Sequence, residues 1–412
     1  MAEMLRRDLR PSAVGQPRRH RPDYLLIILM AILVSVGMIV VYAISPALAA
    51  TNGTNDNYYI IHQFIAIALG IGMFVLTSRI PLSHWRSMYK VLLIIAAVAT
   101  VIALLLPVNP NYPAHRWIRL GGFSFQSVEL LKFALLIWIA GLLADRMKEG
   151  TVGDTKKTLK PLAYMLIAVG FVVAGIQSDL GSTGVILLMM GAMAFVAGLP
   201  MKRILVIAAM VVVLLVVTVA STPYRRERLA TFLDPSANCL TTGYQVCQAL
   251  IAVGSGGATG LGLGRSVQAY GYLPEAENDS IFAIYAEKFG FIGVTALIAL
   301  FLAFFMRIKR IAERAPDNFS RLVVIGILVW LSVQAMVNIG AMLGLLPLKG
   351  ITLPLISYGG SSVLLVMATL GLVFQVSHYT SFASGSGGDT YEDRRDRRRL
   401  RGAYHPSSSS RT

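Results

Sequence analysis

Long apolar stretches recur along the chain, and they limit its fold more than any other feature. A helix needs about 20 mostly apolar residues to cross the hydrocarbon core of a bilayer. Stretches of this kind lie near 24–45, 58–77, 91–107, 128–144, 161–178, 180–198, 203–221, 280–306, 321–346 and 352–378. One is short and two nearly touch, so nine or eleven spans are alternatives. We predict an all-α polytopic membrane protein with ten transmembrane helices.

The composition and the placement of charge exclude other classes. Hydrophobic residues make up 55% of the chain and charged residues 14%, whereas soluble domains carry about 25% charged residues. The net charge of +16 raises the question of nucleic acid,. If the N-terminus is cytoplasmic, however, 28 of the 37 Lys and Arg fall in inner segments and 7 in outer ones. This asymmetry predicts that both termini are cytoplasmic and that the basic residues face lipid headgroups, not nucleic acid.

The chain divides into three regions by composition. Residues 1–23 form a basic cytoplasmic segment, 24–378 the membrane domain, and 379–412 a polar tail that we expect to be disordered,. The outer connection 222–278, between helices seven and eight, is the longest loop. Loops without structure of their own rarely exceed about 15 residues. We therefore predict a large, structured extracytoplasmic loop.

Ionisable residues within the spans point to a polar cavity. Such residues are costly in a bilayer and usually face a bundle interior or water. They are Glu129, Lys132, Asp179, Asp279, Glu287 and Lys288, all toward the outer leaflet. Glu129 and Lys132 are three residues apart and can pair on one helix. A self-neutralising structural pair and a role in substrate binding both remain open.

Asp279 begins the eighth predicted span, and the small residues Ala283, Ala286 and Gly290 follow on its helix face. This stripe is consistent with a groove leading from the carboxylate and equally with close helix packing. The Gly-rich run 254–264 in the outer loop lacks the Gly-Lys-Ser/Thr of a nucleotide loop,. We predict no nucleotide, although backbone amides in the run could contact a pyrophosphate.

Two further features belong to the outer side. Cys239 and Cys247, the only cysteines, lie in the outer loop, where an oxidising compartment permits a disulfide,. Their spacing leaves a bonded and a free pair equally open. Gly and Pro residues within 344–362 break the last span at membrane depth, which is tolerated only beside protein or water,. Lys349 in this segment is a cation suited to an anionic phosphate.

Six ordered stretches resemble the SEDS family of bacterial cell-wall polymerases, which includes FtsW of division and RodA of elongation. They are His115-Arg-Trp-Ile-Arg-Leu-Gly with Phe125-Gln126 and Glu129-Leu-Leu-Lys132; Gln177-Ser-Asp-Leu-Gly181; Gly260-Leu-Gly-Leu-Gly-Arg-Ser266; Leu273-Pro-Glu-Ala276 through Asp279 to Phe282; Phe289-Gly-Phe-Ile-Gly293; and Asn338-Ile-Gly through Ser357-Tyr-Gly-Gly-Ser-Ser362. Together they run through most of the membrane region. Lys349 and Ser266-Val-Gln268 are more similar to the FtsW branch than to the RodA branch.

The resemblance implies an activity and a site. Members of the family transfer lipid II onto a growing glycan strand and release undecaprenyl pyrophosphate. The aspartate that Asp279 matches is essential in the family. We expect Asp279 to act as general base in an inverting transfer, with its pKa raised by burial and by Glu275 and Glu277. The predicted substrate-binding residues are Lys349, Arg116, Glu129, Lys132, Asp179, Glu275, Ser357 and Ser361. The family usually has His-Thr where this chain has Glu277-Asn278.

The resemblance also implies a setting. It places the protein in the bacterial cytoplasmic membrane at the division septum, with its active site outward. The expected partners are a class B penicillin-binding protein transpeptidase and membrane proteins of the division complex. A divalent cation, Mg²⁺ or Mn²⁺, is implied as well, although no metal site is recognisable in the sequence. The alternative functions are a lipid II flippase and a scaffold in which Asp279 is dispensable.

Overall fold

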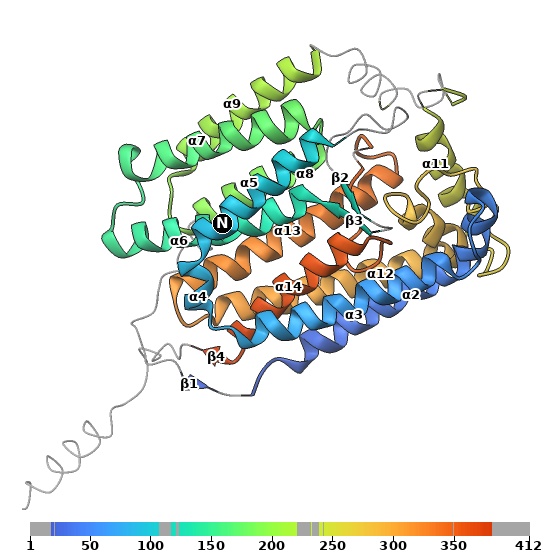
Figure 1. The fold of residues 1–412 in the computed structure, drawn as a ribbon, viewed down its shortest axis with the longest axis horizontal. Helices are drawn as coiled ribbons and strands as arrows, with labels where there is room; N and C mark the ends of the chain where they lie inside the picture. Colours follow the sequence, from blue (N-terminus) through green and yellow to red (C-terminus); the bar gives the residue numbers. More distant parts are fainter. Residues whose placement is uncertain are drawn as a thin grey trace, which may run out of the picture.

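The protein is a bundle of helices whose long axes run in roughly the same direction (Figure 1). The computed structural model describes residues 18–19, 21–106, 117–120, 123–220, 232, 239–241, 243–348 and 350–380. Most of the predicted basic segment and of the predicted disordered tail therefore lie outside the described residues.

Helices make up most of the described chain. They are α2 (Tyr24–Asn52), α3 (Tyr58–Arg79), α4 (Leu82–Ser87), α5 (Tyr89–Leu105), α6 (Ser127–Glu149), α7 (Lys160–Val169) between two π-helical segments (Thr155–Leu159 and Gly170–Ile176), α8 (Leu180–Val196), α9 (Met201–Ala220), α11 (Tyr244–Ser255), α12 (Ile281–Glu313), α13 (Asn318–Met342) and α14 (Gly360–Val376). Two short antiparallel strand pairs join β1 (Arg18–Arg19) to β4 (Tyr379–Thr380) and β2 (Trp117–Leu120) to β3 (Phe123–Gln126).

Each of the ten predicted apolar stretches overlaps one of these helices. Helices satisfy every backbone hydrogen bond internally, as the lipid core requires. Six are long and apolar enough to cross a membrane: α2, α3, α6, the segment Thr155–Ile176 around α7, α12 and α13. Helices α5, α8 and α14 are apolar but shorter. The predicted class, a mostly helical polytopic membrane protein, is thus confirmed.

Helices α6 and α13 form the interior of the bundle, and α7 and α9 lie at its edge (Figure 1). Of the 18 most apolar consecutive residues of α6, 72% are buried, against 28% in the segment around α7. Small residues allow close approach between the inner helices, as is common in membranes. A Cβ on Gly326 of α13 would meet Leu136 of α6 at 2.2 Å and Met193 of α8 at 2.7 Å.

The outer helices present apolar side chains on their outward faces. Ile28 of α2, Phe64 of α3, Ile94 of α5 and Phe171 beside α7 are each more than half exposed. Continuous apolar surface of this kind would be a liability in water. It is the surface expected of helices that face lipid.

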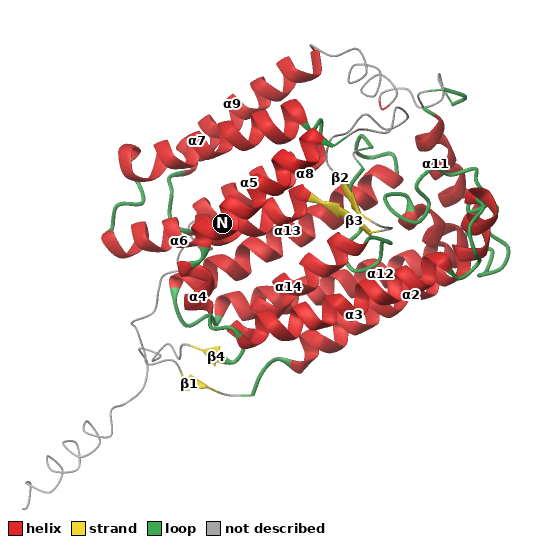
Figure 2. Cartoon of the chain, viewed as in Figure 1, coloured by secondary structure: helices red, strands yellow, loops and turns green. Residues whose placement is uncertain are grey.

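Both ends of the described chain meet at one end of the bundle. Arg18 and Arg19 of β1 pair with Thr380 and Tyr379 of β4, and Figure 2 shows the two strands side by side. Because β1 precedes α2 and β4 follows α14, the described ends of the chain share one side of the bundle.

The glycine-rich run of the outer loop packs against a break in α12. Gly290 interrupts this helix with φ 64° and ψ −165°. A Cβ on Gly256 or Gly260 would lie 2.2 or 2.1 Å from a carbonyl oxygen of α12. The amides of Leu261 and Gly262 donate to α12 carbonyls at 2.9 and 3.0 Å. The small stripe of α12 thus serves close packing here, and these two amides are not available to a pyrophosphate.

Candidate functional site

Asp279 lies near the end of a series of tight turns, 271–280, that leads into α12. The helix begins only after Ser280, its N-cap, so Asp279 lies just outside the helix. Glu275 has a positive φ of 52°, and its carbonyl accepts hydrogen bonds from the N–H groups of Asn278 and Ser280 at 3.1 and 3.0 Å. These bonds fix the turn that carries the carboxylate.

Asn338 of α13 holds this turn from the side. Its Nδ2 donates to the backbone carbonyls of Asp279 at 2.7 Å and Ile351 at 2.6 Å. Asp279 is partly exposed and lines a small pocket with Leu348 and Gly350. The pocket measures about 10 Å³, which is near the minimum for one water molecule. The pocket therefore encloses no more than one water molecule beside the carboxylate.

The non-helical segment 350–359 supports the same turn from another direction. The Ser357 hydroxyl donates to the carbonyl of Asn278 at 2.7 Å and accepts a backbone N–H at 2.7 Å. The N–H of Tyr358 donates to the carbonyl of Glu277 at 2.9 Å. Ser357 is only 3% exposed. The Ser357 hydroxyl therefore holds the turn by binding a backbone carbonyl of the turn.

Glu129 and Lys132 form an enclosed ion pair in α6. Lys132 Nζ lies 2.6 Å from Glu129 Oε1 and 3.0 Å from Gln334 Oε1. It also lies 4.8 Å from the centre of the Trp330 ring. The lysine and glutamate side chains are 1% and 4% exposed, and Gln334 Nε2 donates to the Thr352 carbonyl at 3.0 Å. This enclosure favours the structural interpretation of the pair over direct contact with substrate.

Helix α13 links the ion pair to the Asp279 turn. Gln334, which contacts Lys132, and Asn338, which contacts Asp279, are four residues apart, about 6 Å along the helix axis,. We did not name either amide as a site residue from the sequence. The available signal was two uncharged polar side chains at helical spacing within an apolar helix. The structure thus places Asp279 and the Glu129–Lys132 pair about one helical turn apart along α13.

Asp179 and Ser361 connect the first turns of neighbouring helices. Asp179 is 1% exposed and caps α8, where it accepts the N–H and the hydroxyl of Ser182 at 2.9 Å each. Gln126 Nε2 donates to Asp179 Oδ2 at 3.5 Å. The N–H of Gln126 donates to Ser361 Oγ at 3.1 Å. Both residues therefore tie the starts of α6, α8 and α14 together.

Glu277, in the same turn, is a largely buried acidic residue with a raised pKa. Its pKa is raised from 4.5 to about 7, chiefly by burial and also by the negative charges of Glu275 and Asp279, against a backbone hydrogen bond that lowers it. Asn278 Nδ2 donates to Glu275 Oε2 at 2.7 Å. A carboxyl group that titrates near neutral pH thus lies two residues from Asp279.

Glu287 and Lys288 anchor the outer loop to α12. Glu287 is fully buried, and it accepts the N–H groups of Val267 and Gln268 at 2.9 and 3.2 Å. Lys288 Nζ donates to the carbonyl of Leu263 at 2.7 Å. These two residues hold the loop beside the Asp279 turn and do not line its pocket.

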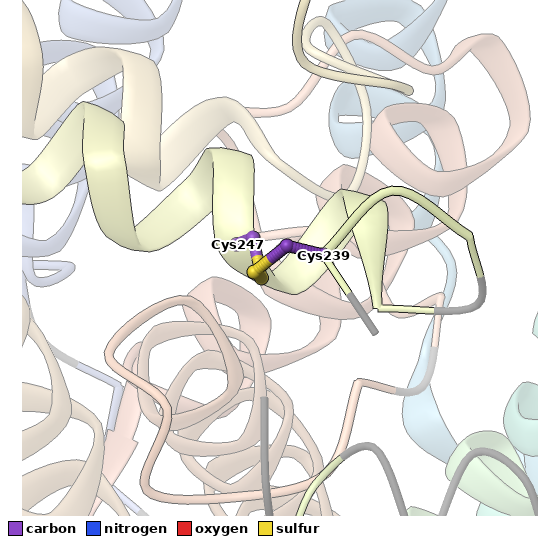
Figure 3. The surroundings of a disulfide bond; sticks show 2 residues. All are labelled: Cys239 and Cys247. Carbon is purple, nitrogen blue, oxygen red and sulfur yellow. A yellow bond between two sulfur atoms is a disulfide. The ribbon is translucent and has the colours of Figure 1, made fainter. Parts of the chain in front are cut away.

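Cys239 and Cys247 form a disulfide, with their Cα atoms 5.6 Å apart (Figure 3). Cys247 lies in the first turn of α11, and Gln245 of the same helix donates to Ser280 at 3.2 Å. The bond therefore fastens the chain entering α11 next to the start of α12. The described residues 243–278 of this connection contain α11 and a series of turns.

The described residues do not form a metal centre by themselves. Among them, no three His, Cys, Asp or Glu side chains are close enough together to hold a metal ion. The divalent cation that the resemblance implies therefore stays a prediction, and carboxylates near Asp279 would have to hold it together with phosphate oxygens of a ligand. Two predicted substrate-binding cations, Arg116 and Lys349, lie outside the described residues.

Comparison with known proteins places this site in a family. A family model described as a cell cycle protein, FtsW/RodA/SpoVE, matches residues 23–382. A probable peptidoglycan glycosyltransferase FtsW of Saccharophagus degradans is 41% identical over 366 residues, covering 87% of this chain and 93% of that protein. Stage V sporulation protein E of Bacillus subtilis is 34% identical, covering 89% and 99%.

Solved structures agree with these sequence matches. A structure titled for the coordination of polymerization and crosslinking by a peptidoglycan synthase complex has a TM-score of 0.69 at 28% identity, covering 86% of this chain and 97% of that one. The rod shape determining protein RodA of Thermus thermophilus has a TM-score of 0.61 at 26% identity, with 86% and 96% covered. The resemblance found in the sequence is confirmed, and the chain belongs to the FtsW/RodA/SpoVE family.

Proposed function

We propose that this chain polymerises lipid II into glycan strands, with Asp279 as the general base. Its family makes it a glycosyltransferase, since several curated relatives carry the name of probable peptidoglycan glycosyltransferase. One observation carries the assignment of the base. Asp279 is partly exposed at a small pocket, while its backbone is clamped by Asn338 and its turn by the segment 350–359.

The clamp suits a general base because the carboxylate is held in place before the substrate arrives. Asp279 takes the proton of the acceptor sugar 4-hydroxyl as that oxygen attacks the anomeric carbon of the donor. The bond to the pyrophosphate oxygen breaks on the opposite face, so an α-linked donor becomes a β-1,4 linkage. Pyrophosphate leaves without protonation, and the reaction needs one carboxylate within hydrogen-bond reach of the hydroxyl.

Positive groups are expected to stabilise the leaving pyrophosphate. Arg116 and Lys349 are the candidates that we retain for this role. Lys132 is a weaker one, because its ammonium group is occupied by Glu129 and Gln334 and is 1% exposed. We assign Lys132 and Glu129 to the positioning of α13. A divalent cation, Mg²⁺ or Mn²⁺, would supply further positive charge for the pyrophosphate, and we keep it as part of the proposal.

The setting is part of the proposal. The chain is a multi-pass membrane protein, and we place ten spans in the cytoplasmic membrane, both termini inside and Asp279 outside. The joined ends of the described chain and the excess of Lys and Arg in the inner segments support this orientation,. We propose a class B penicillin-binding protein as partner and the division septum as location. A solved relative from a peptidoglycan synthase complex supports the first point.

The test is polymerisation of labelled lipid II by the full chain with its penicillin-binding partner in liposomes. We expect Asp279→Asn to lower the rate by at least about 100-fold, because general-base catalysis contributes on that scale. Asp56→Asn is the matched control, since Asp56 is an exposed carboxylate in the connection between α2 and α3. The control should retain the wild-type rate.

Thermal unfolding and partner co-purification establish that Asp279→Asn is folded. Equal polymer from the wild type and this variant would overturn the catalytic assignment. Movement of lipid II across the bilayer without polymer formation would favour the flippase. Wild-type protein that binds its partner but neither polymerises nor moves lipid II would favour the scaffold.

A further inference from the structure

A basic pocket lies at the end of α12 far from Asp279. It measures about 170 Å³ and is lined by Arg21, Arg307, Arg310 and Arg314, among other residues. This is more than ten times the volume that one water molecule requires. Asp23 is the one acidic residue among the described residues that line it, so the pocket has a formal excess of three positive charges.

The arginines converge because of their spacing. Arg307, Arg310 and Arg314 follow one another at three and four residues, so they share one face of α12,. Like charges at such spacing destabilise a helix unless an anion neutralises them. Arg21 precedes α2 and joins them from a different part of the chain. Four guanidinium groups from two elements thus surround one hollow.

The single carboxylate is already engaged. Asp23 Oδ2 lies 2.6 Å from Arg307 Nε, and Oδ1 accepts the N–H of Leu26 at 3.2 Å, capping α2. Asp23 also donates its own N–H to Ser377 at 3.1 Å. The carboxylate therefore fixes Arg307 in the wall of the pocket, beside Arg310 and Arg314 on the same face of α12.

The position of the pocket indicates the kind of anion. It lies where β1 and β4 meet, at the end of the helix bundle, and Tyr379 is part of its wall. Tyr24, which begins α2 next to it, is 59% exposed. Exposed tyrosines at the ends of membrane helices are typical of the headgroup region. Guanidinium groups bind phosphate oxygens through paired hydrogen bonds.

We propose that this pocket binds the phosphate group of an anionic lipid headgroup in the leaflet that faces the chain termini. Basic pockets between membrane helices bind anionic headgroups in this way. The lipid would join the start of α2, the end of α12 and the segment after α14. The site is independent of the glycosyl transfer proposed above, because about 40 Å of α12 separates Arg307 from the start of the helix beside Asp279,.

The test uses the delipidated full chain in neutral detergent and native mass spectrometry with phosphatidylglycerol. Arg310→Gln with Arg314→Gln should bind this lipid about tenfold more weakly. Arg310→Lys with Arg314→Lys keeps the charge and should lose less affinity. Lys156→Gln with Lys157→Gln removes two exposed positive charges elsewhere and should bind as the wild type does.

Two further arms identify the source of the phosphate and the role of charge. Glycerol 3-phosphate at the same concentration should not displace the lipid. The wild type and the double Gln variant should bind zwitterionic phosphatidylcholine equally. Equal binding of phosphatidylglycerol by these two proteins would overturn the site. Displacement by glycerol 3-phosphate would overturn the lipid as its ligand. Neither result depends on polymerase activity, so the two proposals fail separately.

Discussion

Two ion pairs in this protein have the same length and opposite surroundings. Lys132 and Glu129 lie 2.6 Å apart with side chains 1% and 4% exposed. Arg307 and Asp23 also lie 2.6 Å apart, but their side chains are 26% and 12% exposed. The first pair is buried inside the bundle, whereas the second borders a pocket. Distance alone therefore says little about what either pair contributes.

The surroundings change the energetics of each pair. A buried charge that loses its partner retains its full desolvation penalty, whereas a solvated charge is screened by water and salt. The enclosed pair should therefore hold α13 beside Asp279 rigidly. The bordering pair leaves arginines that can bind a further anion. The following predictions test this contrast, starting with the largest expected effect.

Lys132→Met should destabilise the protein by about 3–5 kcal/mol, because Glu129 would remain buried without its cation. Glu129→Gln combined with Lys132→Met removes both charges and should recover much of this loss. The measurement is the apparent free energy of unfolding in mixed micelles by denaturant titration. A double variant as unstable as the single one would show that the pair is not the source of the effect.

Glu277 tests burial without a partner cation. Its pKa is raised from 4.5 to about 7 by burial, so the folded state binds the proton more tightly than the unfolded state. The associated stability is fully present below about pH 4.5 and is lost as the pH rises to 7. The loss corresponds to at most about 3 kcal/mol.

We expect Glu277→Gln to remove this part of the pH dependence and to be more stable than the wild type at pH 8. Unfolding titrations between pH 5 and 8 provide the measurement. Asp56→Asn, at an exposed carboxylate, should keep the wild-type slope. Parallel pH profiles for the wild type and Glu277→Gln would contradict a raised pKa at Glu277.

The architecture was largely predictable because the membrane imposes a local requirement. An apolar run long enough to cross the bilayer must form a helix, and each predicted stretch overlaps one. The break before α14 was predicted as well, from Gly and Pro. The helix itself begins at Gly360, later than the predicted span at 352, because residues 350–359 bond to the Asp279 turn instead.

The site was predictable only in part, because its contacts depend on how helices face one another. The sequence singled out Asp279 and the Glu129–Lys132 pair by their charge in apolar surroundings. The only local sign that Asn338 and Gln334 would join them was their spacing of four residues within an apolar helix. The sequence argument treated Glu277 only as a neighbour of Asp279, whereas burial in the folded protein raises the pKa of Glu277 itself.

Asp23→Asn is the smallest change and separates the charge of the bordering pair from its other role. Asparagine caps a helix as well as aspartate does, so the bond from Leu26 that caps α2 should persist. Loss of the ion pair should then cost less than about 1 kcal/mol. Asp23→Ala loses the cap too and should cost about 1 kcal/mol more. Denaturant titration of both variants provides the measurement.

The same variant should bind anionic lipid more tightly than the wild type, because the carboxylate no longer offsets the arginines,. A cost of 3 kcal/mol or more for Asp23→Asn would show that the bordering pair behaves like the enclosed one. Weaker lipid binding would show that Asp23 mainly orients Arg307 for the phosphate. A small cost together with tighter binding would establish that the two pairs, equal in length, differ because only one of them is open to a ligand.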